Sequence, residues 1–181
     1  MSRYAVFIDG GYYRKVLKEF GSPAIDLLKL SNEFSNGDER LRTYYYDCAP
    51  YIGNPPTVDD QKRQKGFDSF RQSIENLPRF QVRLGRLQRI VTAAGIRFEQ
   101  KKVDVLLAVD LLKLSIDHQI QRAIIIAGDS DFTLAIIAAC DAGTVTELYY
   151  HIPPKAHNEL LSACDERHLI TKDLINIVLK K

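Results

Sequence analysis

The sequence predicts an α/β fold in which a mainly parallel β-sheet is covered by helices on both faces. Apolar runs of strand length at 4–8 and 122–127, and a further expected strand at 145–150, alternate with longer stretches that have helical spacing. Strands that are apolar throughout are typical of a sheet buried on both faces, and their alternation with helices is typical of parallel pairing. The length of 181 residues suits one domain, which we expect to span 1–181.

The first half of the chain is expected to supply three strands and three helices. The run at 4–8 is closed by Asp9, Gly10 and Gly11, which indicates a buried strand ended by a turn. Prolines and glycines make 49–60 a loop, and large apolar residues between 61 and 76 recur at spacings of three and four. The expected elements are strands at 4–8, 41–48 and 80–87 and helices around 13–20, 25–35 and 61–76.

The second half is expected to continue the alternation. Residues 103–116, dense in leucine, give the strongest helix of the sequence, and Gly143 is a usual helix terminator. The expected elements are an extended segment at 96–98, strands at 122–127 and 145–150, and helices at 103–116, 131–142, 158–164 and 173–179. Each extended segment is followed by a helix, as parallel strands require.

Composition argues against several classes of protein. Hydrophobic residues make up 45% of the chain, which is ordinary for a globular fold. The sequence contains no run of 18 apolar residues that would indicate a membrane span. The N-terminus enters a strand-like segment directly, without the features of a signal peptide, so we expect a cytoplasmic protein with no membrane partner. The three cysteines lack CxxC spacing, which argues against a disulfide scaffold or a cysteine-ligated zinc site.

Acidic side chains follow two of the predicted strands and open one of the predicted helices. Asp9 closes the strand at 4–8, while Asp129 and Asp131 follow the strand at 122–127. Asp104 opens the long helix, and a crossover helix begins at the carboxyl end of the strand before it. Because ligands of open α/β sheets bind outside the carboxyl ends of the strands, we expect these four acids at one functional edge.

A cluster of four carboxylates needs compensating charge. Two unit charges about 4 Å apart repel by about 4 kcal/mol at an effective dielectric constant near 20. Protons or cations must offset that repulsion, and hard divalent ions prefer oxygen ligands. Mg²⁺ is held by a few carboxylates, waters and substrate phosphates, and two such ions promote phosphodiester cleavage. The acids therefore predict a divalent metal site.

Each acid also has an ordinary structural interpretation. Asp9 before two glycines suits a turn, Asp104 suits the first turn of a helix, and Ser130 beside Asp131 suits a helix cap. Taken together the positions favour the metal site, because a cap needs only one oxygen. Asp110 lies among apolar residues on a different helix face from Asp104, so we expect it to be paired, in a structural role or one that supports the metal ligands, with a place in the metal site as the less favoured alternative.

Three segments resemble those of the NYN domain family, which belongs to the PIN-like nuclease superfamily, and within it the bacterial LabA-like group. They are Val6-Phe7-Ile8-Asp9-Gly10, the stretch from Lys102 to Leu111, and Ala127-Gly128-Asp129-Ser130-Asp131-Phe132. The order and spacing of the segments match from residue 4 to about residue 165. The resemblance implies a PIN-like three-layer sandwich and a metal-dependent ribonuclease acting on single-stranded or structured RNA.

The resemblance also implies which residues act. The catalytic residues that would hold Mg²⁺ or Mn²⁺ are Asp9, Asp104, Asp129 and Asp131. Two positions depart from the family pattern. The asparagine usual two residues after the first glycine is Tyr12, and the glycine usual before Val103 is Lys102. The first change predicts weaker metal binding or activity.

Several residues near the acids are candidates for contact with RNA. Aromatic rings stack on unpaired bases, and basic side chains bind phosphates. Tyrosines also commonly pack in a core, and lysines commonly lie on the surface in contact with solvent. The candidates are Tyr12, Tyr13, Arg14 with its neighbour Lys15, Lys102 and Ser130. The basic run Lys62-Arg63-Gln64-Lys65 is a further candidate for a flexible contact.

Three functions have to be separated. The leading one is hydrolysis of RNA. The second is an RNA-binding or regulatory module on the same fold with weak or no activity, which Tyr12 favours. The third is a phosphohydrolase with a phospho-aspartate at Asp9, but Gly11 occupies the place of its companion acid. The oligomeric state stays open, with a homo-oligomer as one option.

Overall fold

Seven strands and seven helices make up the structure, a computed structural model that describes residues 2–92 and 95–180, without the side chains at 86–89, 91–92 and 96–101. The strands are β1 (Arg3–Asp9), β2 (Glu39–Cys48), β3 (Phe80–Thr92), β4 (Gly95–Lys101), β5 (Arg122–Ile126), β6 (Val145–Tyr150) and β7 (Glu166–Leu169). The helices are α1 (Gly10–Glu19), α2 (Leu27–Glu33), α3 (Val58–Glu75), α4 (Val103–Ile116), α5 (Thr133–Asp141), α6 (Asn158–Ala163) and α7 (Lys172–Ile177), with a 3₁₀ turn η1 (Ser130–Phe132).

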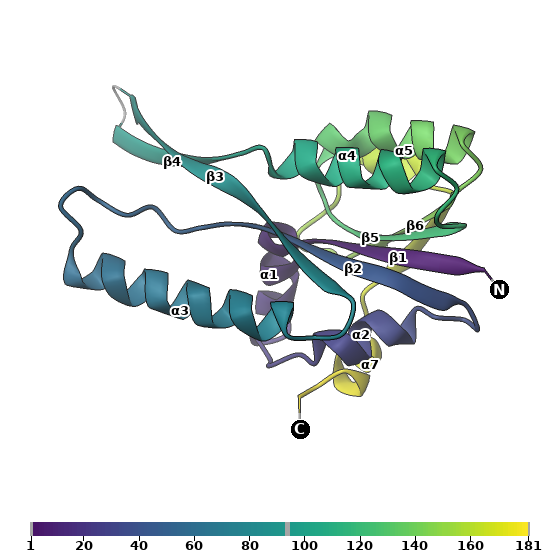
Figure 1. The fold of residues 1–181 in the computed structure, drawn as a ribbon, viewed down its shortest axis with the longest axis horizontal. Helices are drawn as coiled ribbons and strands as arrows, with labels where there is room; N and C mark the ends of the chain where they lie inside the picture. The colour runs from purple at the N-terminus through teal and green to yellow at the C-terminus, as the bar shows by residue number, and fades with distance from the viewer. Residues whose placement is uncertain (1, 93–94, 181) are drawn as a thin grey trace.

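All seven strands join one sheet, in the order β4-β3-β2-β1-β5-β6-β7. Every neighbouring pair is parallel except β3 and β4, which form an antiparallel hairpin. Helices α4 and α5 lie on one face of the sheet, and α2, α3 and α7 lie on the other (Figure 1). The mainly parallel α/β sandwich predicted from the sequence is thus confirmed.

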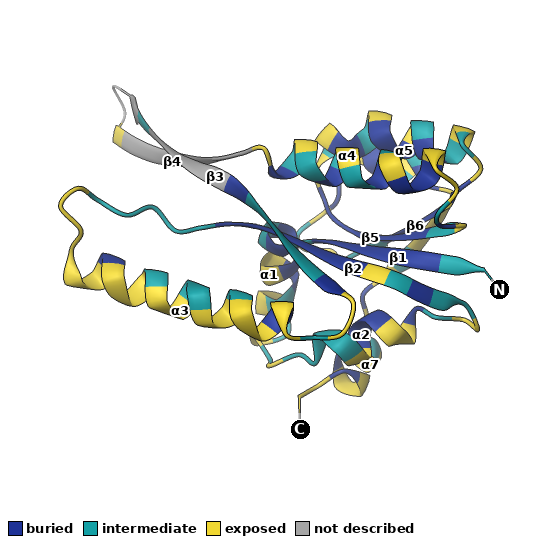
Figure 2. Cartoon of the chain, in the orientation of Figure 1, coloured by how far each residue is buried: buried dark blue, intermediate teal, exposed yellow. Residues whose placement is uncertain are grey.

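Two apolar cores fill the space between the layers. Along β1 the side chains alternate, so that Ala5 and Phe7 face α4, α5 and α6, while Val6 and Ile8 face α1, α2 and α7. All four side chains are fully buried, and most of β1 is dark blue in Figure 2. In the described part of the chain, no helix has the length and apolar character needed to cross a membrane.

The structure differs from the expected elements at a few places that have local causes. Helix α4 spans the residues expected, but α1 begins at Gly10, earlier than expected, because Asp9 caps it. Helix α3 begins inside the expected loop, where Thr57 and Asp60 form a capping box. The edge strand β7 was not expected, because its four residues are mostly exposed and lack an apolar run.

A network of paired charges holds the amino edge of the sheet. Arg122, the first residue of β5, donates to Glu147 (2.7 Å) and to Asp38 (2.9 Å), and also to the carbonyl oxygens of Phe34 and Ser35. The guanidinium is mostly buried, and both acids are too. The network joins the segment before β2 to the central strands, with opposite charges balanced.

Removing the arginine should weaken the whole fold. We expect Arg122→Leu to lower the free energy of unfolding by about 3 kcal/mol, because it leaves two partly buried carboxylates without their partner. Urea denaturation measures the change. The matched control is Arg42→Leu on β2, an exposed arginine whose one side-chain bond to the described residues goes to Gln81, and its effect should stay within about 0.5 kcal/mol. Equal losses in the two variants would contradict the assignment.

Candidate functional site

A cleft of about 490 Å³ opens at the carboxyl edge of the sheet, where β1 and β5 end and α4 begins. All four aspartates singled out in the sequence contribute to its wall. The residues that line it are Asp9, Gly11, Tyr12, Lys15, Asp104, Gly128, Asp129, Asp131, Pro154, Lys155 and His157. The fold therefore brings acids that are up to 122 residues apart in the chain to one cleft.

Two of the acids are held in place by capping helical turns. Oδ1 of Asp9 accepts hydrogen bonds from the N–H groups of Gly11 (2.9 Å) and Tyr12 (3.2 Å), and Oδ1 of Asp129 accepts one from Asp131 (3.2 Å). Each cap uses one carboxylate oxygen, and neither Oδ2 bonds to any described residue. The structural and the metal-binding interpretations of these acids are therefore compatible, because the second oxygen can face the cleft.

Asp104 has the least compensated charge of the four. It lies in the first turn of α4, is partly buried, and makes no hydrogen bond or ion pair with any residue that the structure describes. Burial raises the pKa of its carboxyl to about 6, and the negative charges of the other three cleft aspartates add to the rise. Burial likewise raises the pKa of Asp9, although the two capping N–H groups oppose that effect.

The spacing of the acids suits hydrated ions better than a tight cage. Within the described residues, three ligand atoms come within 4.8 Å of one another at Glu147, Glu166 and His168, not at the cleft aspartates. That other group lies toward the amino edge of the sheet, and Arg122 already neutralises Glu147. Mg²⁺ usually keeps several of its waters and takes only one or two carboxylates, so a site for it does not require three acids at such close spacing.

Tyr12 forms part of the cleft floor. Its side chain is 7% exposed, and its ring lies against Gly128, where a methyl group in place of the glycine hydrogen would come within 2.3 Å of the ring. The Tyr12 hydroxyl donates to the carbonyl of Pro154 and accepts from the N–H of His151, both at 3.1 Å. The tyrosine found where the family usually has asparagine therefore ties α1 to the loop after β6.

Helix α1 presents different residues to two sides. Gly11, Tyr12 and Lys15 line the cleft, whereas Tyr13 and Arg14 line a separate cavity on the other side of the helix. Successive residues point about 100° apart around a helix, so neighbours in sequence separate in this way. Of the predicted RNA contacts on this helix, Tyr12 and the neighbouring Lys15 lie at the cleft, and Tyr13 and Arg14 do not.

The loop after β6 brings residues to the cleft that the sequence analysis missed. Lys155 and His157 are exposed on its wall, and the N–H of His157 donates to the carbonyl of Gly128 at 3.0 Å. Their position follows from the pairing of β6 with β5, which places the loop after β6 beside Asp129. Basic residues soon after a strand were the available signal, but the strand order was needed to interpret it.

The remaining candidates lie outside the cleft lining. Asp110 is held by Arg83 (3.0 and 3.1 Å) and by the buried Tyr46 hydroxyl (3.0 Å), so it is paired, as expected. Lys102 is exposed just before α4 with a left-handed φ of 76°, a conformation that favours the glycine usual there. Ser130 begins η1 beside the acids and is absent from the lining.

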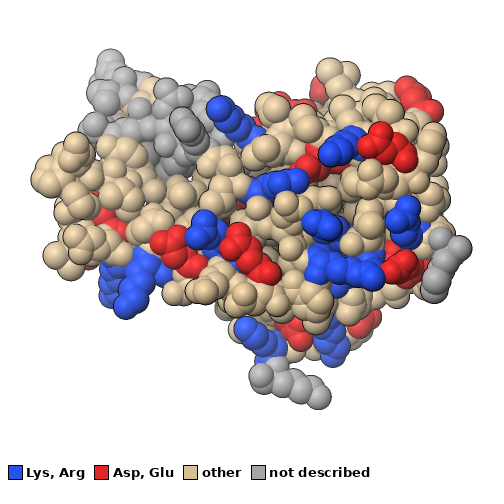
Figure 3. Space-filling model, viewed as in Figure 1, with Lys and Arg blue, Asp and Glu red and all other residues tan. Residues whose placement is uncertain are grey.

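The basic run at 62–65 lies on α3, so it is held on a helix and does not form the flexible contact expected. Arg63 pairs with Asp60 on the same helix and lines the other cavity with Arg14. Across the described surface on the face that carries α3 and α4, basic and acidic side chains are interspersed and form no single basic patch (Figure 3). The positive groups best placed for a phosphate beside the acids are therefore Lys15 and Lys155.

Replacing Asp104 should stabilise the protein at neutral pH. Its raised pKa means that the folded state binds more protons than the unfolded state between the ordinary value of 3.8 and about 6, so the carboxyl increasingly costs stability as pH rises through that window. We expect Asp104→Asn to raise the free energy of unfolding by about 1 kcal/mol near pH 8, after allowing for solvent screening, and by much less near pH 4. Urea titrations at both pH values measure the difference.

Asp59 provides a matched control for this effect. It occupies the same second position of its helix, α3, but is exposed and lies outside the cleft. Asp59→Asn loses only a favourable interaction with the helix dipole, so it should lower stability by roughly 0.3–1 kcal/mol. If both substitutions lowered the free energy of unfolding near pH 8, Asp104 would feel no excess negative charge from the other acids.

A methyl group at Gly128 should disturb the cleft floor. We expect Gly128→Ala to lower the free energy of unfolding by about 2 kcal/mol, because the new carbon collides with the Tyr12 ring. In a Tyr12→Ala background the same substitution should cost much less, and a double-mutant cycle from denaturation curves measures the coupling. Additive effects would mean that the ring and the glycine do not contact each other.

Comparison with known proteins agrees with this architecture. A crystal structure of a protein of unknown function from Vibrio parahaemolyticus has a similar fold, with a TM-score of 0.63 and 19% identity, covering 99% of this chain and 96% of that chain. A search of curated proteins finds no significant match. The family model of the NYN domain matches residues 3–171, a range that contains every cleft residue, and the chain therefore belongs to the NYN domain family, whose fold is that of PIN-like nucleases.

Proposed function

We propose that this chain is a metal-dependent ribonuclease of the LabA-like group, which hydrolyses RNA phosphodiester bonds in the aspartate cleft. The observation that carries the proposal is the state of Asp104. Asp104 is a partly buried carboxyl whose pKa rises to about 6 beside three other acids, and no described residue forms an ion pair that would compensate its charge. Perturbed acids grouped in a cleft are typical of functional sites.

The cleft offers oxygen ligands of the kind that Mg²⁺ and Mn²⁺ prefer. The residues that would hold the metal are Asp9, Asp104, Asp129 and Asp131. When bound, the metal supplies Lewis-acid chemistry to the scissile phosphodiester. The three capping hydrogen bonds fix Oδ1 of Asp9 and of Asp129, so these side chains need little reorganisation to present their second oxygens.

The basic groups around the acids suit a polyanionic substrate. Lys15 on α1 and Lys155 on the loop after β6 stand on the wall of the same cleft. They attract phosphates that flank the metal, while the acids repel phosphate when no metal is bound. This arrangement favours binding of RNA and metal together.

An RNA-binding or regulatory module with little activity is the second candidate. The observation that favours it is the role of Tyr12, which fills the floor of the cleft and bonds to the loop after β6 where the family usually has asparagine. A buried phenol donates to a carbonyl here and offers no amide to the acids. Both candidates share the fold and the RNA partner, and they differ in whether the bond is cut.

Asp129→Asn provides the direct test. The amide oxygen can still cap η1, so the fold should persist, but the side chain loses its negative charge for the metal. We expect Mn²⁺-dependent cleavage of single-stranded RNA to fall by about a hundredfold or more, since metal contacts supply several kcal/mol of transition-state stabilisation. Cleavage of a fluorescently labelled oligoribonucleotide measures the rate, and the chelator EDTA should abolish it in the parent.

The control is Asp141→Asn, an exposed acid at the end of α5, which should leave the cleavage rate unchanged. Equal rates for the Asp129 variant and the parent would refute the proposed role. Tight binding of RNA by the parent with no cleavage in Mg²⁺ or Mn²⁺ would favour the second candidate.

A further inference from the structure

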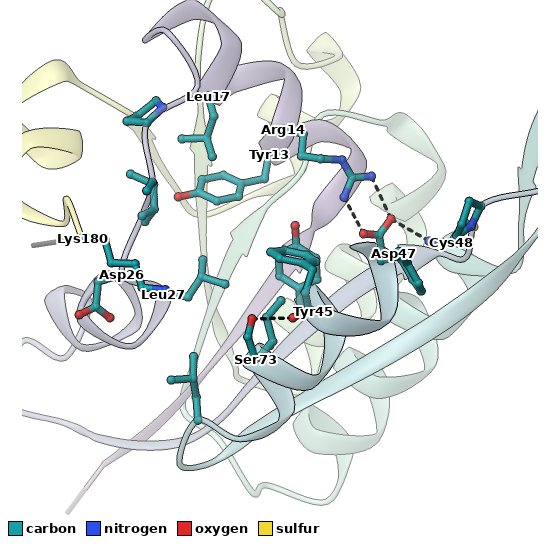
Figure 4. Close-up of a pocket in the computed structure, with 18 of the residues that line it drawn as sticks. Tyr13, Arg14, Leu17, Asp26, Leu27, Tyr45, Asp47, Cys48, Ser73 and Lys180 are labelled. Carbon is teal, nitrogen blue, oxygen red and sulfur yellow. Dashed lines mark hydrogen bonds and ion pairs between the residues drawn. The ribbon is translucent and has the colours of Figure 1, made fainter. Parts of the chain in front are cut away.

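A second cavity, of about 590 Å³, lies on the opposite side of α1 from the aspartate cleft. Its walls come from α1, the segment at 23–27, α3 and the end of β2 (Figure 4). The volume is within the range of pockets that hold small molecules, and much larger than the voids usual in a packed interior. None of the aspartates of the cleft lines it.

The lining of this cavity is mainly apolar and rich in aromatic rings. Tyr13, Tyr45, Phe67 and Phe70 contribute rings, and Tyr45 meets Phe70 edge to face with centroids 5.7 Å apart. The apolar residues of α3 recur at spacings of three and four, the pattern that normally packs a helix onto a core. Here that stripe borders the cavity, and Phe70 stays 41% exposed.

Both arginines of the wall are paired with acids, while Asp26 caps α2 through the N–H of Lys29 and Lys180 is exposed. Arg14 donates to both carboxylate oxygens of Asp47 at one end of the cavity, at 2.5 and 2.9 Å, as Figure 4 shows. Arg63 is paired with Asp60 through a single contact. A charged ligand beside the arginines would have to break these pairs or remain uncompensated among the aromatic rings, so this part of the lining favours a neutral molecule.

One buried polar atom of the wall has no partner. The hydroxyl of Tyr13, whose side chain is 2% exposed, bonds to no described residue, and burial raises its pKa far above the ordinary value. Figure 4 shows Tyr13 extending from α1 beside Leu17 into the lining. Buried hydroxyl groups are normally satisfied, so a small shift of the ring toward an acceptor in the cavity would be favourable.

We propose that this cavity is a binding site for a neutral, largely aromatic small molecule that carries a hydrogen-bond acceptor. The volume, the aromatic lining, the paired arginines and the unpartnered hydroxyl each support this class of ligand. The site is separate from the nuclease chemistry and does not depend on it. Because α1 forms a wall of both the cavity and the cleft, an occupant would contact the helix that Asp9 caps.

The neutral fluorophore N-phenyl-1-naphthylamine is a suitable probe, because its emission rises in apolar sites. We expect a saturable increase with one probe bound per chain. Ser73→Trp, on the cavity side of α3, should weaken probe binding by at least about tenfold by filling the space. Ser69→Trp makes the same change one turn earlier on a surface outside the cavity lining, and should leave the affinity unchanged.

Circular dichroism would establish that both variants fold. Equal affinities in the two variants, or an increase that does not saturate, would overturn the proposal. Displacement of the probe by a single-stranded oligoribonucleotide would assign the cavity to a base of RNA instead, and would also overturn it.

Methyl-labelled NMR spectra of the parent chain give a test that needs no variant. On addition of the probe, the methyl signals of Leu17, Leu27 and Ile74 around the cavity should shift. Those of Val109 and Ile137, exposed apolar residues on α4 and α5, should not. Shifts confined to α4 and α5 would show that the probe binds an exposed surface and would contradict the assignment.

Discussion

The parallel pairing of β1 with β5 is the constraint on which the cleft depends. Ile8 lies opposite Ile126 in the register, so the two strands end at the same level of the sheet and run in the same direction. Asp9 follows directly from the first strand, and Asp129 follows after a short link from the second. An antiparallel pairing would send these acids to opposite ends of the sheet.

The two edges of the sheet treat charge in opposite ways. At the amino edge, Arg122 sits between Asp38 and Glu147, so buried charges of opposite sign are balanced within the protein. At the carboxyl edge the acids accumulate around Asp104 without such a partner in the described residues. The first arrangement stabilises the fold, and the second leaves negative charge that a bound cation can neutralise.

Much of the fold and the acids of the site could be predicted from sequence, because they depend on local pattern and on one topological rule. Strand termini are visible as apolar runs closed by Asp9 or by Gly128 and Asp129, and α4 had clear helical character. The role of Lys155 could not be predicted, because it depends on which strand lies beside β5. The unexpected β7 is a short edge strand whose side chains contact solvent more than core, so pairing rather than pattern defines it.

Helix α1 has ten residues, and two of its sides line different cavities. On one side Tyr12 and Lys15 border the acids, and on the other Tyr13 and Arg14 border the aromatic cavity. Its first residue, Gly10, fits so closely against β2 that a side-chain carbon would come within 2.8 Å of a backbone oxygen. Few positions of α1 can therefore accept another amino acid without disturbing a contact. We expect α1 to tolerate fewer substitutions than α3, whose side chains mostly face solvent.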